Sequence, residues 1–207
     1  MSPARSTRPL RIAHFLWSMD LKDGGVVRAL LDLCPALAAA GHEITMLCCR
    51  DKDIPETWRS GAAGVPRLVR LSMPGRFNLL GRDALAEAER VLSGVDVLHL
   101  HGMWMPSNDQ IAAAALRRGL PYVWSPHGML DDWCMAQGAI KKRMYLRMRE
   151  RSLLERAACV HCTAQAELDQ ARKWFPNGRG RVTPLLFDLE PFRALPGPEL
   201  ARRAFAL

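Results

Sequence analysis

Short apolar runs alternate with amphipathic segments along most of the chain. The apolar runs have the length and near-continuous hydrophobicity of strands that are buried on both faces, and they cover 11–17, 43–49, 65–71, 95–100, 121–125, 157–162 and 181–186. Between them lie segments whose apolar residues recur at helical spacing, at 26–37, 82–94, 110–119, a long stretch before 157, and 164–175. This alternation predicts an α/β domain with a Rossmann-like, doubly wound parallel sheet.

Three pairs of residues follow predicted strands, at the edge where sheets of this kind bind ligands. They are Gly24–Gly25 after the first strand, His101–Gly102 after the fourth and His127–Gly128 after the fifth. In a parallel sheet, ligands bind beyond the carboxyl ends of the strands, so we expect these residues to share one rim. Glycine also lets the backbone leave a strand sharply and approach a ligand closely.

Each pair also has an explanation without a ligand. The amide groups of Gly24 and Gly25 open a predicted helix and could hold an anion such as a diphosphate, but an ordinary glycine turn fits the sequence equally well. His101 and His127 could instead be hydrogen-bonded strand-end residues. For His99, which alternates into the sheet packing, that structural interpretation is the favoured one.

The composition is that of a globular domain. Of the 207 residues, 49% are hydrophobic and 24% are charged, and no run reaches the roughly 18 apolar residues that a membrane-spanning helix needs. The basic first residues lead into too short an apolar stretch for a signal peptide, so we expect a cytoplasmic protein. The stretch "CVHC" at 159–162 has the spacing of half a zinc site, but no second pair follows it, and no metal is predicted.

Basic residues give the chain a net charge of +8, and seven of them lie within 139–156 against two acids. An anionic membrane surface would attract such a segment. Charged and apolar residues alternate around its helical projection, however, which also fits a solvated basic helix. Peripheral membrane contact through 139–156, at the inner face of the membrane, therefore stays open. No helix-turn-helix or aromatic stacking motif accompanies the charge, so nucleic acid is not an expected partner.

Four stretches resemble the N-terminal domain of glycosyltransferase family 4, the nucleotide-sugar-dependent retaining transferases of the GT-B fold. They are "DGGVVRALLDLCPALAAAGHEITMLC", "DVLHLHGMW", "SPHGMLDDW" and "KKRMYL", and the resemblance covers about residues 9–192. It implies a metal-independent hexosyltransferase with no cofactor beyond its donor substrate, a nucleotide-diphosphate sugar. The acceptor would be a glycan or a lipid-linked molecule in surface polysaccharide or glycoconjugate synthesis.

The resemblance also implies roles for single residues. His127 matches the histidine that contacts the donor sugar and supports its transfer, which makes it the catalytic candidate. In relatives the Gly-Gly loop closes over the donor phosphates, and the end of the fourth strand lines the acceptor side of the cleft. The implied substrate-binding residues are Gly24, Gly25, His101, Gly102, Gly128 and Asp131.

Three departures from the family pattern affect this reading. Asp132 stands where similar sequences often have proline, and Leu185–Leu186 replace an Asn-Gly pair at the end of the last strand. The third concerns the second Rossmann-like domain of GT-B enzymes, which carries the nucleotide pocket and which we expect to be absent here. The expected organisation is a flexible tail at 1–8, the glycosyltransferase-like domain at 9–192, and the start of an interdomain linker at 193–207.

Two functions are compatible with these observations. The first is a glycosyltransferase whose acceptor-binding half is this chain and which is inactive without a C-terminal domain. The second is a non-catalytic module that binds a sugar, a lipid head group or a partner protein through an open cleft. A reading frame directly downstream that encodes a second Rossmann-like domain would favour the first.

Overall fold

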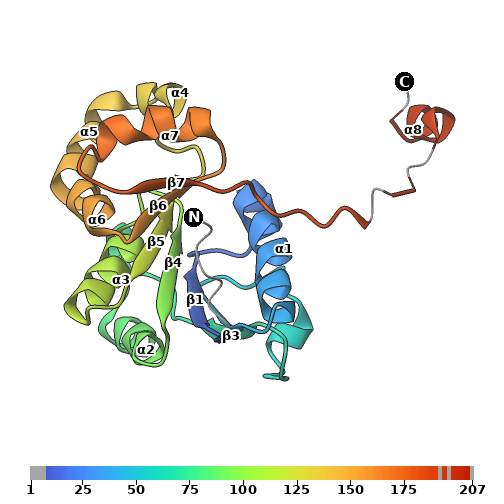
Figure 1. Ribbon diagram of the computed structural model, residues 1–207, viewed down its shortest axis with the longest axis horizontal. Coiled ribbons are helices and arrows are strands. Elements are labelled where there is room, and N and C mark those ends of the chain that lie inside the picture. The colour runs from blue at the N-terminus through green and yellow to red at the C-terminus, as the bar shows by residue number, and fades with distance from the viewer. Residues whose placement is uncertain (1–7, 191–192, 195–196, 206–207) are drawn as a thin grey trace.

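Seven parallel strands form one sheet in this computed structural model, which describes residues 8–190, 193–194 and 197–205 (Figure 1). The strands are β1 (Arg11–Phe15), β2 (Glu43–Cys48), β3 (Arg67–Arg70), β4 (Val97–His101), β5 (Tyr122–Ser125), β6 (Cys159–Cys162) and β7 (Gly180–Val182). Their order is β3-β2-β1-β4-β5-β6-β7, and every neighbouring pair runs parallel. The order reverses between β1 and β4, which is the point where open parallel sheets bind ligands.

Helices connect the strands, and several of them are short. The α-helices are α1 (Gly25–Ala39), α2 (Arg82–Leu92), α3 (Pro106–Arg117), α4 (Asp132–Ala136), α5 (Ala139–Tyr145), α6 (Arg151–Arg156), α7 (Gln165–Ala171) and α8 (Pro198–Phe205). A π-helical turn (Leu146–Glu150) joins α5 to α6. Single 3₁₀ turns cover Leu21–Asp23, Glu56–Trp58, Arg76–Asn78 and Arg172–Trp174.

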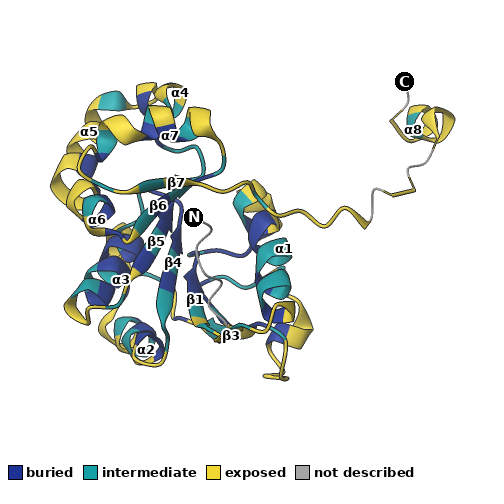
Figure 2. Ribbon diagram, viewed as in Figure 1, coloured by how far each residue is buried: buried dark blue, intermediate teal, exposed yellow. Residues whose placement is uncertain are grey.

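The two faces of the sheet carry separate apolar cores. Helix α1 packs on one face through residues such as Leu30, which joins a cluster with Met46 of β2. Helices α2, α3, α6 and α7 cover the other face, where Leu100 and Trp124 are fully buried (Figures 1 and 2). Burial on both faces explains why the strands read as continuous apolar runs.

The predicted doubly wound parallel sheet is confirmed, and the differences lie at the ends of elements. Helix α3 begins at Pro106, whereas the predicted helix begins at 110. Proline fits the first position of a helix. The residues that follow it are polar, so the apolar periodicity used for the prediction does not include them. The strand predicted for 181–186 ends at Val182, and the residues after it are extended without strand pairing.

The predicted domain limits fall at the margins of the described chain. Residues 1–7 and 191–192 lie outside the described residues, so the tail at 1–8 and the boundary at 192 stay predictions. Within 193–207, Pro198–Phe205 forms α8, which buries none of its residues and lies at the end of an extended segment away from the sheet (Figure 1). No helix in the described ranges is both long and apolar enough to cross a membrane.

Candidate functional site

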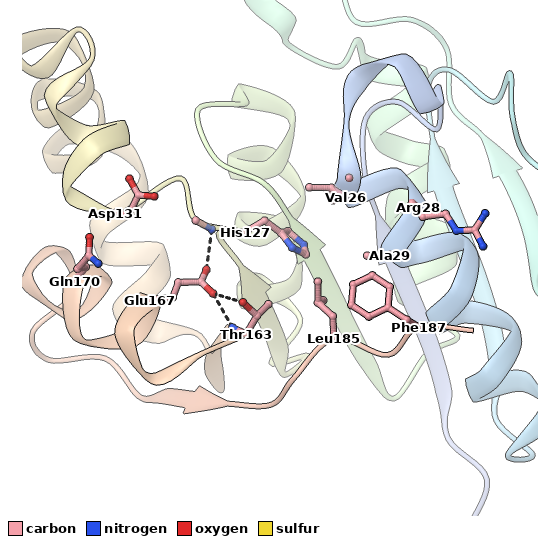
Figure 3. A pocket seen from close by; sticks show the side chains of 12 residues that line it. Val26, Arg28, Ala29, His127, Asp131, Thr163, Glu167, Gln170, Leu185 and Phe187 are labelled. Carbon is pink, nitrogen blue, oxygen red and sulfur yellow. Dashed lines mark hydrogen bonds between the residues drawn. The ribbon is translucent and has the colours of Figure 1, made fainter. Parts of the chain in front are cut away.

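A cleft of about 630 Å³ opens at the carboxyl edge of the sheet, between α1 and the loops that follow β5 and β6 (Figure 3). Four residues predicted from the sequence line it: Gly25, His127, Gly128 and Asp131. The remaining lining residues are Val26, Arg28, Ala29, Thr163, Glu167, Gln170, Leu185 and Phe187. The edge that the topology favours for ligands is therefore hollowed, and it gathers the α1 and β5 motifs at one place.

The first turn of α1 forms one wall of the cleft. Gly24 precedes the helix and has φ +118°, a backbone conformation that other residues rarely adopt. Because glycine has no side chain, no side-chain cap occupies this end of the helix. Gly24 itself is not a lining residue, whereas Gly25 is. A Cβ added at Gly25 would meet nothing within 4 Å, so the missing side chain leaves open space for a ligand. The N–H of Val27 donates to the Gly24 carbonyl, and the N–H groups of Gly25 and Val26 favour an anion there.

The turn after β5 forms the opposite wall, and its backbone is strained. His127 has φ +54° and Gly128 has φ +76°, so two successive residues adopt left-handed conformations. Glu167 of α7 holds this turn, since its carboxylate accepts the Gly128 N–H at 2.7 Å and the Thr163 N–H at 2.6 Å. A strained non-glycine residue fixed in this way is characteristic of functional sites.

Asp131 caps a helix and also lines the cleft. It precedes α4, and its carboxylate accepts the Cys134 N–H at 2.5 Å, so it caps that helix. It also lines the cleft near Gln170, whose side chain accepts the Asp132 N–H at 2.9 Å. The loop from His127 to Asp131 is thus tied to α7 at both of its ends.

His101 and Gly102 lie behind the cleft wall instead of on it. His101 is 2% exposed, and its Nδ1 atom is 3.0 Å from Nε2 of His127. The carbonyl of Gly102 accepts hydrogen bonds from Asn108 and Trp124. Their predicted contact with an acceptor substrate stays a prediction, and the contact that the structure shows for His101 is with His127.

Burial keeps the imidazoles of this region neutral at neutral pH. It lowers the pKa of His127 to about 4, although the nearby Glu167 opposes the shift, and it lowers the pKa of His14 to about 4. The pKa values of His99 and His101 fall well below the ordinary value for the same reason. Each ring therefore carries one proton and one lone pair, so it can both donate and accept a hydrogen bond.

Three imidazoles bring ring nitrogens within 4.8 Å of one another: His14, His99 and His101. Such a group could hold a transition metal. Both nitrogens of His101, however, already lie at hydrogen-bond distance from other rings, at 3.1 Å from Nδ1 of His14 and 3.0 Å from Nε2 of His127. Hydrogen bonding between neutral rings therefore accounts for the cluster.

The cysteines of "CVHC" do not converge. Alternation along β6 places Cys162 in the core with α7, while Cys159 lines a cavity on the α1 side of the sheet. The six cysteines are all free thiols. The pair therefore cannot supply two sulfur ligands to one metal.

The cleft contains functional candidates that the sequence analysis did not select. Glu167 and Gln170 come from α7, whose periodicity predicts the helix but not which polar residues face the cleft. The signal for Glu167 is an acid in the first turn of a helix that follows a strand, a position that commonly accepts backbone N–H groups. Phe187 lies beyond the last strand, where no periodicity exists.

The fold and the cleft define the class of protein: a Rossmann-like α/β domain that corresponds to one half of the GT-B architecture. The structure of HepE from Anabaena, in complex with UDP and glucose, superposes with a TM-score of 0.68 at 16% identity, over 95% of this chain and 50% of that one. UDP-GlcNAc 2-epimerase from Neisseria meningitidis, bound to UDP-GlcNAc, gives a TM-score of 0.50 at 9% identity, over 84% and 46%. The chain spans about half the length of these proteins.

The chain belongs to the glycosyl transferase 4-like domain family, whose model matches residues 24–185. The match begins at Gly24, directly before α1, and ends at Leu185, so it includes both walls of the cleft. No curated protein sequence matches the chain. The predicted resemblance to glycosyltransferase family 4 is thereby confirmed at the level of the family and the fold.

Proposed function

We propose that this chain is the acceptor-side domain of a retaining, metal-independent hexosyltransferase that uses a nucleotide-diphosphate sugar as donor. The observation that carries the proposal is the cleft, in which the first turn of α1 faces the strained His127–Gly128 turn (Figure 3). Membership of the glycosyl transferase 4-like family and the UDP and glucose bound to HepE support it. The acceptor is a glycan or a lipid-linked molecule in surface polysaccharide or glycoconjugate synthesis.

Each wall has its own part in this proposal. The N–H groups of Gly25 and the next residue approach the donor phosphates, and the φ of Gly24 turns the chain so that they can. His127 contacts the donor sugar, with Gly128 and Asp131 beside it. Because its pKa is about 4, His127 acts at neutral pH as an uncharged hydrogen-bonding group.

The cleft has too little positive charge to hold a diphosphate by itself. Arg28 is the one cation among the lining residues, and it pairs with Asp32 at 3.2 Å, while Asp131 and Glu167 are acids. A helix terminus stabilises an anion by at most about 2 kcal/mol, whereas even a 1 mM affinity requires about 4 kcal/mol. We infer that a C-terminal domain supplies the remaining charge.

Two assays test this proposal. Calorimetric titration of the 207-residue chain with several nucleotide-diphosphate sugars should give millimolar affinity or weaker, and a radiolabelled assay should detect no transfer. In the two-domain enzyme, His127→Ala should lower turnover about 100-fold. It should lower the free energy of unfolding by only about 1–3 kcal/mol, because the buried Nδ1 of His101 loses its partner. Micromolar binding by the chain alone, or equal turnover of parent and variant, contradicts the proposal.

The basic segment 139–156 supports the proposal of a lipid-linked acceptor. Ile140, Met144 and Met148 recur every four residues and are 83%, 58% and 72% exposed, whereas Leu146 and Leu154 of the same segment are buried. Trp133 of α4 is 74% exposed as well. The structure therefore separates an exposed apolar stripe from the core side of this segment, which the helical projection alone does not.

Basic side chains flank this stripe. Lys141, Arg147 and Arg151 are exposed around it, and of these only Arg151 pairs with an acid in the described residues, Glu155. Exposed apolar groups between cations suit the interface of an anionic bilayer. We infer that this surface holds the domain at the inner, cytoplasmic face of a membrane, where a lipid-linked acceptor would reach the cleft.

A second candidate function is a non-catalytic binding module. The observation that favours it is a mainly apolar cavity of about 540 Å³ beside the cleft, to which the first proposal gives no role. Its lining includes Leu33, Leu37, Val123 and Leu186. A chain that binds a partner protein through this apolar cavity, but shows no interaction with millimolar nucleotide sugars, would favour this function over the first.

A further inference from the structure

Five histidines form two hydrogen-bonded chains on the α1 side of the sheet. In the first chain, Nδ1 of His14 lies 3.1 Å from Nε2 of His101, and Nδ1 of His101 lies 3.0 Å from Nε2 of His127. In the second, Nε2 of His99 contacts the Ser125 hydroxyl at 2.7 Å, and this hydroxyl contacts Nδ1 of His161 at 2.7 Å. The register of β1, β4 and β5 places these residues side by side.

A backbone carbonyl fixes the direction of the second chain. Nε2 of His161 lies 2.8 Å from the carbonyl of Thr183, which can only accept, so this nitrogen carries the proton. Nδ1 of His161 is then an acceptor, the Ser125 hydroxyl donates to it, and His99 donates to the hydroxyl through Nε2. His99 and His161 are therefore both Nε2–H tautomers.

The first chain has two possible directions, and they differ in what is left at its buried end. Nε2 of His14 is buried and has no hydrogen-bond partner. If His127 donates to His101, then His101 donates to His14 and a buried N–H is left unpaired. If His14 donates to His101 through Nδ1, then a buried lone pair is left unpaired instead. Unpaired buried donors are the rarer of the two in folded proteins.

We propose that His14 is a positioning residue that, through His101, holds His127 as the Nδ1–H tautomer. His14 donates to Nε2 of His101, and His101 donates to Nε2 of His127, which leaves the only proton of the His127 ring on Nδ1. That Nδ1 atom has no partner among the described residues and, unlike Nε2 of His14, it is not sealed from the cleft that the ring lines.

The consequence concerns what the cleft recognises, and it rests on the proposed function. His127 presents an N–H donor and no lone pair, so the group it meets must be an acceptor, such as a hydroxyl or phosphate oxygen of the donor substrate. A proton taken up at His127 cannot leave through His14, because the chain ends there in buried surroundings. His127 is therefore a hydrogen-bond donor to the ligand and not a general base.

The experiment reads the tautomers directly, without a ligand. Two-bond ¹H–¹⁵N correlation spectra of the ¹⁵N-labelled 207-residue chain at about pH 8, after treatment with a chelator, distinguish Nδ1–H from Nε2–H rings. His14, His101 and His127 should be Nδ1–H. His99 and His161 should be Nε2–H, and so should His42, whose Nδ1 accepts the Leu10 N–H at 3.1 Å, which makes it a control.

Two variants test the role of His14. His14→Asp replaces the donor with an acceptor, so His101 should donate to it through Nε2 and accept from His127 at Nδ1, which moves the His127 proton to Nε2. His14→Asn can keep an amide donor near the position of Nδ1 and should leave the His127 proton on Nδ1. The proposal is overturned by a His127 ring that is Nε2–H in the parent, by a proton that His14→Asp does not move, or by Zn²⁺ that shifts the ring signals of His14, His99 and His101 together. Circular dichroism checks the fold, and the tautomers in the parent spectrum decide alone if His14→Asp does not fold.

This readout is independent of the proposed function. If nucleotide sugars do not bind but the tautomer pattern appears, the positioning role stands and the function fails. If they bind but His127 is Nε2–H, the function stands and the positioning role fails. Where both hold, His14→Asp should weaken nucleotide-sugar binding several-fold, and His14→Asn should bind like the parent.

Discussion

The two faces of strands β4 and β5 differ: one packs into the apolar core, and the other carries polar residues next to the cleft. On the side of α3, Leu98, Leu100 and Trp124 are fully buried in the larger apolar core. On the side of α1, the alternate residues of the same strands include three polar ones, His99, His101 and Ser125, next to Val97 and Val123. Both faces are largely buried, yet only one of them follows the pattern of a core.

The polar face has a cost that the apolar face does not have. Buried imidazoles and hydroxyls must find hydrogen-bond partners, and a buried polar group without one is destabilising. Here the partners come from one another, and one atom, Nε2 of His14, stays unpaired. A sheet that needed only stability would place leucine or valine at these positions, so we attribute them to the adjacent cleft.

The largest expected loss of stability comes from a substitution on the apolar face. Trp124→Ala removes a fully buried ring and should lower the free energy of unfolding by about 3–5 kcal/mol. It also removes the N–H that donates to the Gly102 carbonyl at 2.8 Å. Urea denaturation followed by circular dichroism measures the change. A loss below about 1 kcal/mol would show that this face is not the stabilising one.

The next effect concerns acid, and it belongs to the polar side. Burial lowers the pKa of His14 from 6.5 to about 4, so the folded state binds its proton less readily than the unfolded state does. Stability from this group is complete above pH 6.5 and is lost as the pH falls toward 4, by up to about 3 kcal/mol. His14→Leu should therefore lose less stability between pH 6.5 and 4 than the parent.

Buried acids act in the opposite direction, so the variant must be compared with the parent at each pH. Burial raises the pKa of Glu150 from 4.5 to about 8, and its contribution therefore falls as the pH rises through that range. Parent and His14→Leu share this contribution, so the difference between their urea midpoints isolates His14. Parallel pH profiles for the two proteins would contradict the pKa assigned to His14.

Substitutions at Gly24 and Gly25 should have different effects, the first on stability and the second on ligand binding. Gly24→Ala should destabilise the fold by about 1–3 kcal/mol, because its φ of +118° is strained for any side chain. Gly25→Ala should be neutral or stabilising by up to about 1 kcal/mol, since it replaces glycine in a helix and meets no atom within 4 Å. It should nevertheless weaken nucleotide-sugar binding several-fold. Equal binding by Gly25→Ala and the parent would remove this turn from the site.

The smallest expected effect tests the membrane surface. Arg147→Gln should lower binding of the chain to vesicles containing anionic lipid by about 1 kcal/mol, or roughly fivefold, because one cation near the surface is lost. Arg67→Gln, on the edge strand β3 away from α5, is the matched control and should have no effect. Cosedimentation with the vesicles measures both. Equal losses for the two variants would indicate general attraction to the basic chain.

The fold could be predicted because apolar runs and helical spacing are local properties of the sequence. The shared rim of Gly25 and His127 was also predictable, since carboxyl ends of parallel strands meet at one edge. Three features were not. His14 lies inside β1, where the sequence reads as an ordinary buried strand, and its partner His101 is 87 residues away. Glu167 needs the packing of α7 to be found, and the polar first turn of α3 is hidden from any apolar periodicity.

The central claim is that the cleft between α1 and the turn after β5 binds the donor nucleotide sugar. Amide NMR spectra of the ¹⁵N-labelled chain during titration with millimolar UDP-sugars and GDP-sugars test it most directly. The account predicts that the amide signals of Gly25, His127 and Gly128 shift first and together with at least one donor, and that Gly25→Ala reduces these shifts. Shifts that cluster elsewhere, or none at all at these three residues, would contradict it.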